Sequence, residues 1–149
     1  MDLTDLRFDE SHTWVRDEGK EVIIGITEFA QDQLGDIIFV ELPEVGSTIV
    51  RDDPFGSIES AKAIEDLVAP INGEVVRRND DVLDAPETIN DDSYGEGWLI
   101  AVKPAEGTDL NKLMNYEHYK KHLKEIENEE GEDEDFDGEE DDLFFDDEE

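Results

Sequence analysis

The chain has 149 residues, a formal net charge of −33 and no cysteine. This length fits one compact domain with a tail, and the lack of cysteine excludes disulfides and thiolate metal sites. The negative charge disfavours nucleic acid or an anionic membrane as a partner. Because the sequence contains no run of 18 apolar residues and no secretory or transit pattern at its N-terminus, we expect a cytoplasmic protein.

Acidic residues are concentrated at the C-terminal end. Residues 127–149 hold 16 of the 45 acidic side chains and neither Lys nor Arg, so we predict a disordered acidic tail there. Residues 1–126, the predicted folded domain, still carry 29 acidic against 12 basic side chains. Salt screens such self-repulsion, and our hypothesis is a salt-rich cytoplasm, as in halophilic archaea. Equal stability in dilute buffer and in molar KCl would contradict this hypothesis.

The first half of the sequence predicts a hairpin, a helix and a strand. Residues 13–26 contain two apolar-rich runs joined by a polar Asp-Glu-Gly-Lys turn, which is typical of a β-hairpin. A short helix is expected at 28–34, because Thr27 can cap its start and Gly35 can end it. Residues 37–42 then form an apolar run that Pro43 terminates, which indicates a mostly buried strand.

The second half predicts further short strands and a terminal helix. Two helices are expected within 108–126: a short one that Thr108 or Asp109 can cap and that runs to Met114, and an amphipathic one at 115–126, whose apolar residues from Tyr116 onward follow helical spacing. Closely spaced short strands favour a mainly β fold, either a small barrel or a sandwich. The remaining strand candidates are 47–50, 55–60, 64–69, 74–78 and 98–103.

Lys62 lies in the most informative segment of the chain. Residues 55–76 contain two β-segments that meet at a connection of small residues, Ser60-Ala61-Lys62-Ala63. A lysine at such a tip presents a long amine to solvent, where a modifying enzyme can reach it. Most exposed lysines are merely solvated, so this pattern alone does not establish a modification.

Several blocks in the right order resemble the glycine cleavage system H protein family, over about residues 7–126. In that family lipoic acid is joined by an amide to the lysine of an E-S-x-K-A sequence, which falls on Lys62 here. The resemblance also implies a flattened β-barrel of the lipoyl/biotinyl type (a barrel-sandwich hybrid) with helices at 28–34 and 108–126. The matching blocks are SHTWVR (11–16), GITEFAQDQLGDIIFVELPEVG (25–46), FGSIESAKA (55–63), LVAPINGEVV (67–76) and YGEGWL (94–99).

The family resemblance implies a non-catalytic carrier, with chemistry supplied by its attached lipoate. A pyridoxal-phosphate glycine decarboxylase (P protein) loads an aminomethyl group onto the arm. An aminomethyltransferase (T protein) passes the one-carbon unit to tetrahydrofolate, and a flavin-dependent dihydrolipoyl dehydrogenase (L protein) reoxidises the dithiol. A lipoate ligase or lipoyltransferase would attach the arm. A monomer is expected, because a shuttle must visit several active sites.

Members of this family fold the loaded arm into a surface cleft. The positions that correspond to its lining are Ser11, Thr13, Trp14, Ile64 and Asp66. The family commonly has an acid where this chain has Thr13, so its pairing with an ammonium group is in question here. Asp66 is still available to pair with the ammonium group, and Asp9 or Glu10 could replace the acid that is missing at position 13. Trp14 also fits simple core packing.

Other functions remain open on the sequence. An H-like protein that relays lipoate to other enzymes would use the same lysine, and an acidic interaction module would use the tail. A biotinyl domain normally has A-M-K-M around its lysine, and a 2-oxoacid dehydrogenase lipoyl domain has D-K-A, unlike the S-A-K-A found here. A hydrolase ranks last because no nucleophile–base motif is present. No metal site is expected, although His118 and His122 share a helix face.

Overall fold

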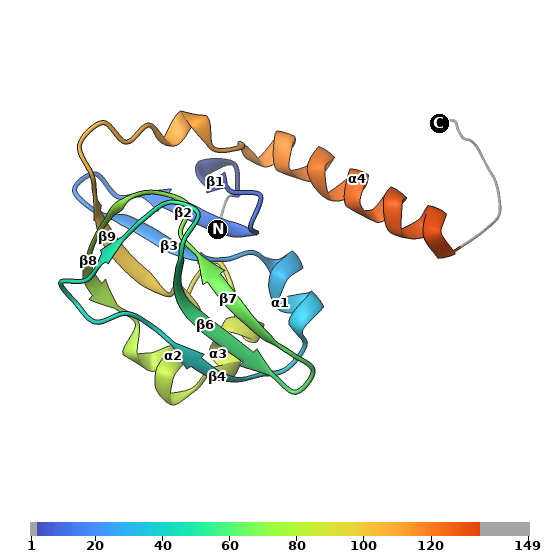
Figure 1. Ribbon diagram of the computed structural model, residues 1–149, viewed down its shortest axis with the longest axis horizontal. Coiled ribbons are helices and arrows are strands. Elements are labelled where there is room, and N and C mark those ends of the chain that lie inside the picture. Colours follow the sequence, from blue (N-terminus) through green and yellow to red (C-terminus); the bar gives the residue numbers. More distant parts are fainter. Residues whose placement is uncertain (1–2, 135–149) are drawn as a thin grey trace. The chain divides into compact units, whose positions relative to one another are not determined.

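The computed structural model describes residues 3–134, with side chains through residue 126. The chain divides into two compact units, Met1–Asn115 and Tyr116–Glu149. The first unit is mainly β, with two antiparallel sheets and several short helices (Figure 1). Within the described residues, no helix is long and apolar enough to cross a membrane.

The larger sheet has the strand order β1-β2-β3-β9-β8-β5. Each neighbouring pair is antiparallel, and β3 lies between β2 and β9 with every residue buried. A strand buried on both faces requires an uninterrupted apolar run, which Val-Ile-Ile-Gly-Ile supplies. The strands are β1 (Arg7–Phe8), β2 (Thr13–Asp17), β3 (Val22–Ile26), β5 (Thr48–Ile49), β8 (Gly73–Arg78) and β9 (Ile100–Pro104).

The smaller sheet contains β4 (Ile37–Glu41), β6 (Pro54–Ser60) and β7 (Ile64–Val68), with β6 in the centre. Apolar side chains from both sheets form a single hydrophobic core, in which Ile24 of β3 and Ile58 of β6 are almost completely buried. The sheets share this core without joining into a closed barrel. The arrangement is therefore a barrel-sandwich hybrid, as predicted, and more open than a continuous flattened barrel.

Helix α1 (Glu28–Leu34) confirms the prediction for residues 28–34. The Thr27 hydroxyl accepts a hydrogen bond from Ala30 N at 3.2 Å, which satisfies one of the free amides of the first turn. At the other end Gly35 has φ +82°, a conformation that glycine adopts without the steric cost of a side chain. Its amide donates to Gln31 O at 2.9 Å and closes the last turn.

Three short helices were not predicted. Each is three to five residues long, so hydrophobic periodicity has no room to develop. Asn79 caps one of them by accepting from Asp81 N, and its side-chain amide donates to Glu96 O and Trp98 O. These helices are η1 (Leu3–Asp5), α2 (Asp80–Asp84) and α3 (Glu87–Asp91).

Both helices predicted within 108–126 are present, with shifted bounds. A 3₁₀ turn, η2 (Leu110–Lys112), is capped by Asp109, and helix α4 (Tyr116–Glu134) starts later. The segment between them is extended, because Met114 exchanges two backbone hydrogen bonds of 2.8 Å with Phe8. Helix α4 continues past residue 126 into the glutamate-rich sequence, where Glu has a high helix propensity. Most of the predicted disordered tail, 135–149, lies outside the described residues.

Candidate functional site

Lys62 lies at the tip of the hairpin formed by β6 and β7. The Ser60 amide donates to Ala63 O at 2.8 Å, which leaves Ala61 and Lys62 as the two residues of the turn. The Ser60 hydroxyl oxygen is buried and accepts hydrogen bonds from Lys62 N at 3.1 Å and Ala63 N at 3.2 Å. These contacts hold the tip backbone, while the Lys62 side chain is exposed and no described acid lies within ion-pair distance of it.

The segment after helix α1 supports the tip from the side. Ala61 N donates to Asp36 O at 3.3 Å. A Cβ built on Gly35 would come within 3.2 Å of Lys62 Cε, so the lysine stem passes directly over this glycine. Gly35 therefore does two things: it ends α1 with a positive φ, and it leaves room for the base of the Lys62 side chain.

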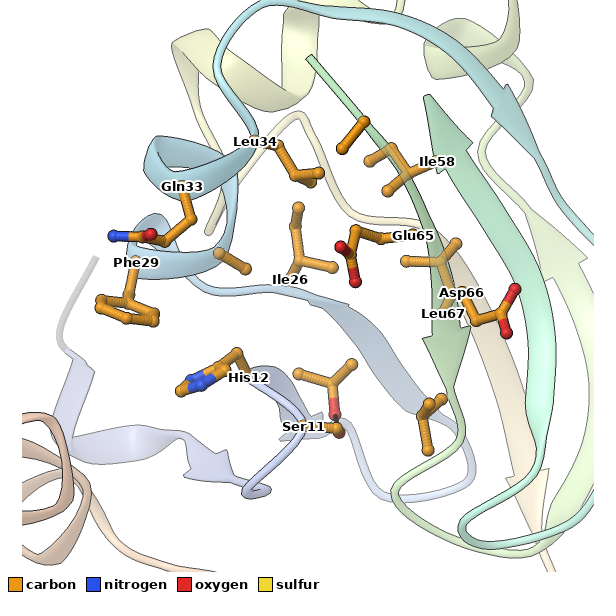
Figure 2. Close-up of a pocket in the computed structure, with 14 residues that line it drawn as sticks. Ser11, His12, Ile26, Phe29, Gln33, Leu34, Ile58, Glu65, Asp66 and Leu67 are labelled. Carbon is orange, nitrogen blue, oxygen red and sulfur yellow. Dashed lines mark hydrogen bonds between the residues drawn. The ribbon is translucent and has the colours of Figure 1, made fainter. Parts of the chain in front are cut away.

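A cavity of about 310 Å³ lies next to the tip, and Ala63 is one of the residues that line it. Its walls come from the turn before β2, from α1, and from β6 and β7 (Figure 2). The walls combine apolar side chains, such as Ile26 and Leu34, with the polar Ser11 and Thr13. A partly apolar cavity with a few convergent polar groups is suited to a slender ligand that ends in a polar group.

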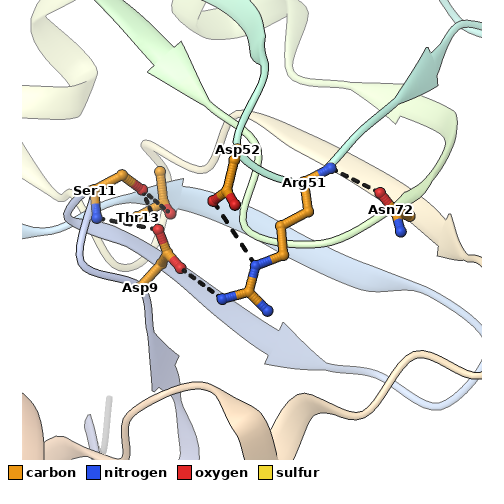
Figure 3. A network of polar contacts seen from close by, with 6 residues as sticks. All are labelled: Asp9, Ser11, Thr13, Arg51, Asp52 and Asn72. Carbon is orange, nitrogen blue, oxygen red and sulfur yellow. Dashed lines mark hydrogen bonds and ion pairs between the residues drawn. The ribbon is translucent and has the colours of Figure 1, made fainter.

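A polar network positions the hydroxyls on one side of the cavity (Figure 3). The Ser11 hydroxyl donates to Asp9 Oδ2 at 2.6 Å and lies 3.1 Å from the Thr13 hydroxyl. Ser11 N donates to the same Asp9 oxygen at 3.1 Å. Arg51 Nη2 is 3.9 Å from Asp9 Oδ1, which helps to compensate the buried carboxylate. Asp9 thus stands behind Ser11, one hydrogen bond away from the cavity.

The five predicted cleft residues divide into two groups. Ser11, Thr13 and Asp66 are among the residues that line the cavity, whereas Trp14 and Ile64 are not. Trp14 is fully buried and donates from Nε1 to Ser93 O at 3.0 Å. Its ring covers Gly25, where a Cβ would meet ring carbons at 2.6 Å. Trp14 therefore packs within the fold.

Ile64 is 67% exposed on the outer face of the smaller sheet. It pairs with Glu59 of β6, and Glu59 pairs with Phe39 of β4, so the three side chains form one row across this face. Phe39 is also half exposed. Ile64 lies beside the lysine tip on the surface, outside the cavity.

Most of the residues that line the cavity were not among the predicted ones, and four of these carry an aromatic ring or a polar side chain: His12, Phe29, Gln33 and Glu65. The rings of His12 and Phe29 are 4.6 Å apart. Gln33 follows Phe29 by four positions on α1, so both belong to one face of that helix, and this spacing was visible in the sequence. Glu65 follows from the strand alternation of β7 only once the pairing with β6 is known.

The two sheets around one core form a barrel-sandwich fold like that of lipoyl domains. The crystal structure of a glycine cleavage system H protein from Mycobacterium marinum matches with a TM-score of 0.75 and 35% sequence identity, covering 81% of this chain and 98% of that one. The family model described as Glycine cleavage H-protein matches residues 6–126.

Sequence relatives agree with the structural match. The glycine cleavage system H protein of Bacillus pumilus is 53% identical over 121 residues, which cover 81% of this chain and 95% of the relative. That of Bacillus subtilis is 50% identical with the same coverage. The chain belongs to the glycine cleavage H-protein family.

Proposed function

We propose that this chain is a non-catalytic lipoyl carrier, with lipoate attached by an amide to Lys62 Nζ. The exposed side chain of Lys62 at a braced hairpin tip, next to the 310 Å³ cavity, is the observation that carries the proposal. The bound lipoyl group would supply a disulfide that accepts an aminomethyl group from glycine. The described residues fit such a group, because small side chains flank the lysine and a mixed apolar and polar cavity lies within its neighbourhood.

Some residues around the tip would present Lys62 to the modifying enzyme, and others would cover the attached arm. Ser60 and the Asp36 carbonyl hold the backbone on which Lys62 is presented. Ile26 and Leu34 would cover the apolar stem of a folded arm, and Ser11 and Thr13 would offer hydroxyl oxygens to its polar end. Asp66 at the cavity edge is a further candidate for this contact. Covering the loaded arm excludes water from a group that hydrolyses when exposed.

The proposed partners are glycine decarboxylase, aminomethyltransferase and dihydrolipoyl dehydrogenase, visited in turn by a monomeric carrier in the cytoplasm. A lipoate ligase or lipoyltransferase would modify Lys62. A tethered arm raises the effective concentration of its end group at each of these active sites without any rate chemistry by the carrier itself. The strong negative charge favours partners whose docking surfaces are basic.

The experiment that tests this proposal is the intact mass of the protein purified from its own host, with peptide mapping across residues 52–77. We expect a single lipoyl increment located on Lys62. The lipoylated protein should then support glycine decarboxylation by the partner enzymes, which distinguishes the shuttle from a protein that relays lipoate elsewhere. An unmodified Lys62 in cells with a working lipoylation system would overturn the proposal.

A further inference from the structure

The connection between α1 and β4, residues 35–37, supports the lysine tip and is itself held by another element. A Cβ on Gly35 would lie 3.2 Å from Lys62 Cε, so the lysine stem runs next to this backbone. Asp36 O accepts a hydrogen bond from Ala61 N in the turn at 3.3 Å. How firmly the tip is held therefore depends on how firmly residues 35–37 are held.

Asn90 holds this connection on both sides of Asp36. Its Oδ1 accepts a hydrogen bond from Ile37 N at 2.9 Å, and its Nδ2 donates to Gly35 O at 2.9 Å. The same Nδ2 donates to Gln31 Oε1 on α1 at 2.8 Å. One half-buried side-chain amide thus uses its acceptor and both of its donor hydrogens to tie the end of α1 to the start of β4.

Asn90 belongs to α3, a short helix that contacts both α1 and β4 (Figure 1). The preceding residue, Ile89, is fully buried in the hydrophobic core. The Ile89 carbonyl accepts from the Ser93 hydroxyl at 2.7 Å, and a Cβ on Gly97 would meet Ile89 Cα at 2.8 Å, so the following chain packs closely against α3. Asn90 therefore extends from a well-packed position towards the connection that supports the tip.

We infer that Asn90 is a positioning residue for the attachment of lipoate to Lys62. This inference rests on the proposed function, and Asn90 acts through residues 35–37. In the attachment step the amine of Lys62 attacks the carbonyl carbon of lipoyl-adenylate. An amide bond forms, the bond from this carbon to the phosphate oxygen breaks, AMP leaves with the electron pair, and the nitrogen gives up a proton.

An enzyme that catalyses this step must bind the lysine tip in one shape. If the tip also adopts other shapes, the apparent affinity falls in proportion to the fraction of molecules in the competent shape. Once bound, the tip has the same shape in every variant, so the acyl transfer itself is unchanged. Loss of the Asn90 contacts should therefore raise the KM for the carrier and leave kcat as it is.

Asn79 offers a matched control in another part of the chain. Its side-chain amide also makes three hydrogen bonds: Oδ1 accepts from Asp81 N, and Nδ2 donates to Glu96 O and Trp98 O. These partners lie at the start of α2 and before β9. Asn79→Ala therefore removes the same kinds of contact as Asn90→Ala, but away from residues 35–37.

The test measures the attachment of lipoate to unmodified parent, Asn90→Ala and Asn79→Ala by purified lipoate ligase supplied with lipoyl-adenylate. We expect a roughly fivefold higher KM for Asn90→Ala at unchanged kcat, which is the scale of one lost hydrogen bond. Asn79→Ala should change KM by less than about twofold, because it is separate from the tip. Urea denaturation identifies the variants that are folded under assay conditions. If Asn90→Ala is not, Asn90→Asp replaces it, since aspartate still accepts from Ile37 N but cannot donate to Gly35 O.

Amide hydrogen exchange of the unmodified proteins, followed by NMR, gives a readout that does not involve the ligase. The Ala61 amide should exchange faster in Asn90→Ala than in the parent, and at the parent rate in Asn79→Ala. An unchanged KM for Asn90→Ala, or equal changes in the two variants, would overturn the inference while leaving Lys62 as the attachment site. Failure of the ligase to modify Lys62 of the parent would overturn both proposals.

Discussion

Two hairpins of this molecule carry an exposed lysine at the tip, and they differ in what surrounds it. The hairpin of β2 and β3 turns through residues 18–21, where Glu18 N donates to Glu21 O at 2.9 Å, and it contains Lys20. The hairpin of β6 and β7 turns at Lys62. Both lysines are exposed, so exposure alone does not distinguish them.

The difference lies in the neighbouring groups. Lys20 stands beside Glu21, and a Cβ added at Gly19 would meet nothing within 4 Å, so this tip extends into open solvent. Lys62 is flanked by two alanines, and its stem passes over Gly35 next to a cavity. A modification site is thus defined by the surface that an enzyme and an attached group would contact, rather than by the reach of the amine.

The largest effect is expected from Lys62→Arg. Arginine keeps the positive charge but has no amine that the lipoyl-attaching enzyme can acylate, so the lipoyl increment should be lost completely. Lys20→Arg is the matched control and should retain full modification. Intact mass spectrometry of both variants from the native host checks this. A lipoyl increment on Lys62→Arg would place the attachment elsewhere.

The second comparison uses a glycine from each region. Gly19→Ala should cost about 1 kcal/mol, since both Gly19 and Gly35 have positive φ and alanine is strained there. Gly35→Ala should cost about 2 kcal/mol, because its new Cβ also crowds the Lys62 stem and the end of α1. Urea denaturation measures both free energies of unfolding. Equal losses would mean that the Lys62 stem moves aside freely.

Ser60→Ala should destabilise the protein by roughly 1–2 kcal/mol. The buried hydroxyl accepts from two backbone amides at the tip, and alanine leaves them without this acceptor. In the other hairpin Asp17 accepts from Gly19 N at 2.9 Å in an exposed position, so Asp17→Ala should cost less than about 0.5 kcal/mol. Chemical denaturation tests the pair, and a larger loss for Asp17→Ala would contradict the expectation.

The smallest effect concerns pH and the ion pair that Glu21 forms at the turn of the β2–β3 hairpin. Arg77 donates to Glu21 at 2.6 Å, and this hydrogen bond holds the pKa of Glu21 below its ordinary value. A carboxylate whose pKa is lower in the folded than in the unfolded state stabilises the folded protein at pH values above its unfolded-state pKa. This contribution is lost as the pH falls through its folded-state pKa.

Because Arg77 is 53% exposed, we expect the pair to contribute less than about 0.5 kcal/mol. The free energy of unfolding should therefore fall slightly less between about pH 6 and about pH 3 for Glu21→Gln than for the parent, as measured by urea denaturation at both pH values. A larger acid dependence in Glu21→Gln than in the parent would reverse the assigned sign.

Local signals explain what the sequence predicted well. Helix α1 could be predicted because its capping residue Thr27 and its terminating Gly35 are visible in the sequence. The turn at Lys62 could be predicted from its small residues. Predicting the cavity requires the tertiary structure, since Ser11, Phe29 and Glu65 come from three separate elements. Their meeting depends on how the sheets share a core, which no local pattern encodes. Trp14 matched the family cleft by position, but packing against Gly25 places it in the interior.

The brace at the lysine tip has a mechanical consequence. Ser60 and the Asp36 carbonyl hold the turn backbone by hydrogen bonds, so any group joined to Lys62 moves about a supported attachment point. The region that the group can reach is then set by the length of the side chain and its attachment, and the cavity adjoins the tip at Ala63. A more mobile tip would let the attached group reach a larger volume. It would also lower the effective concentration of the end group, both in the cavity and at the active site of each partner.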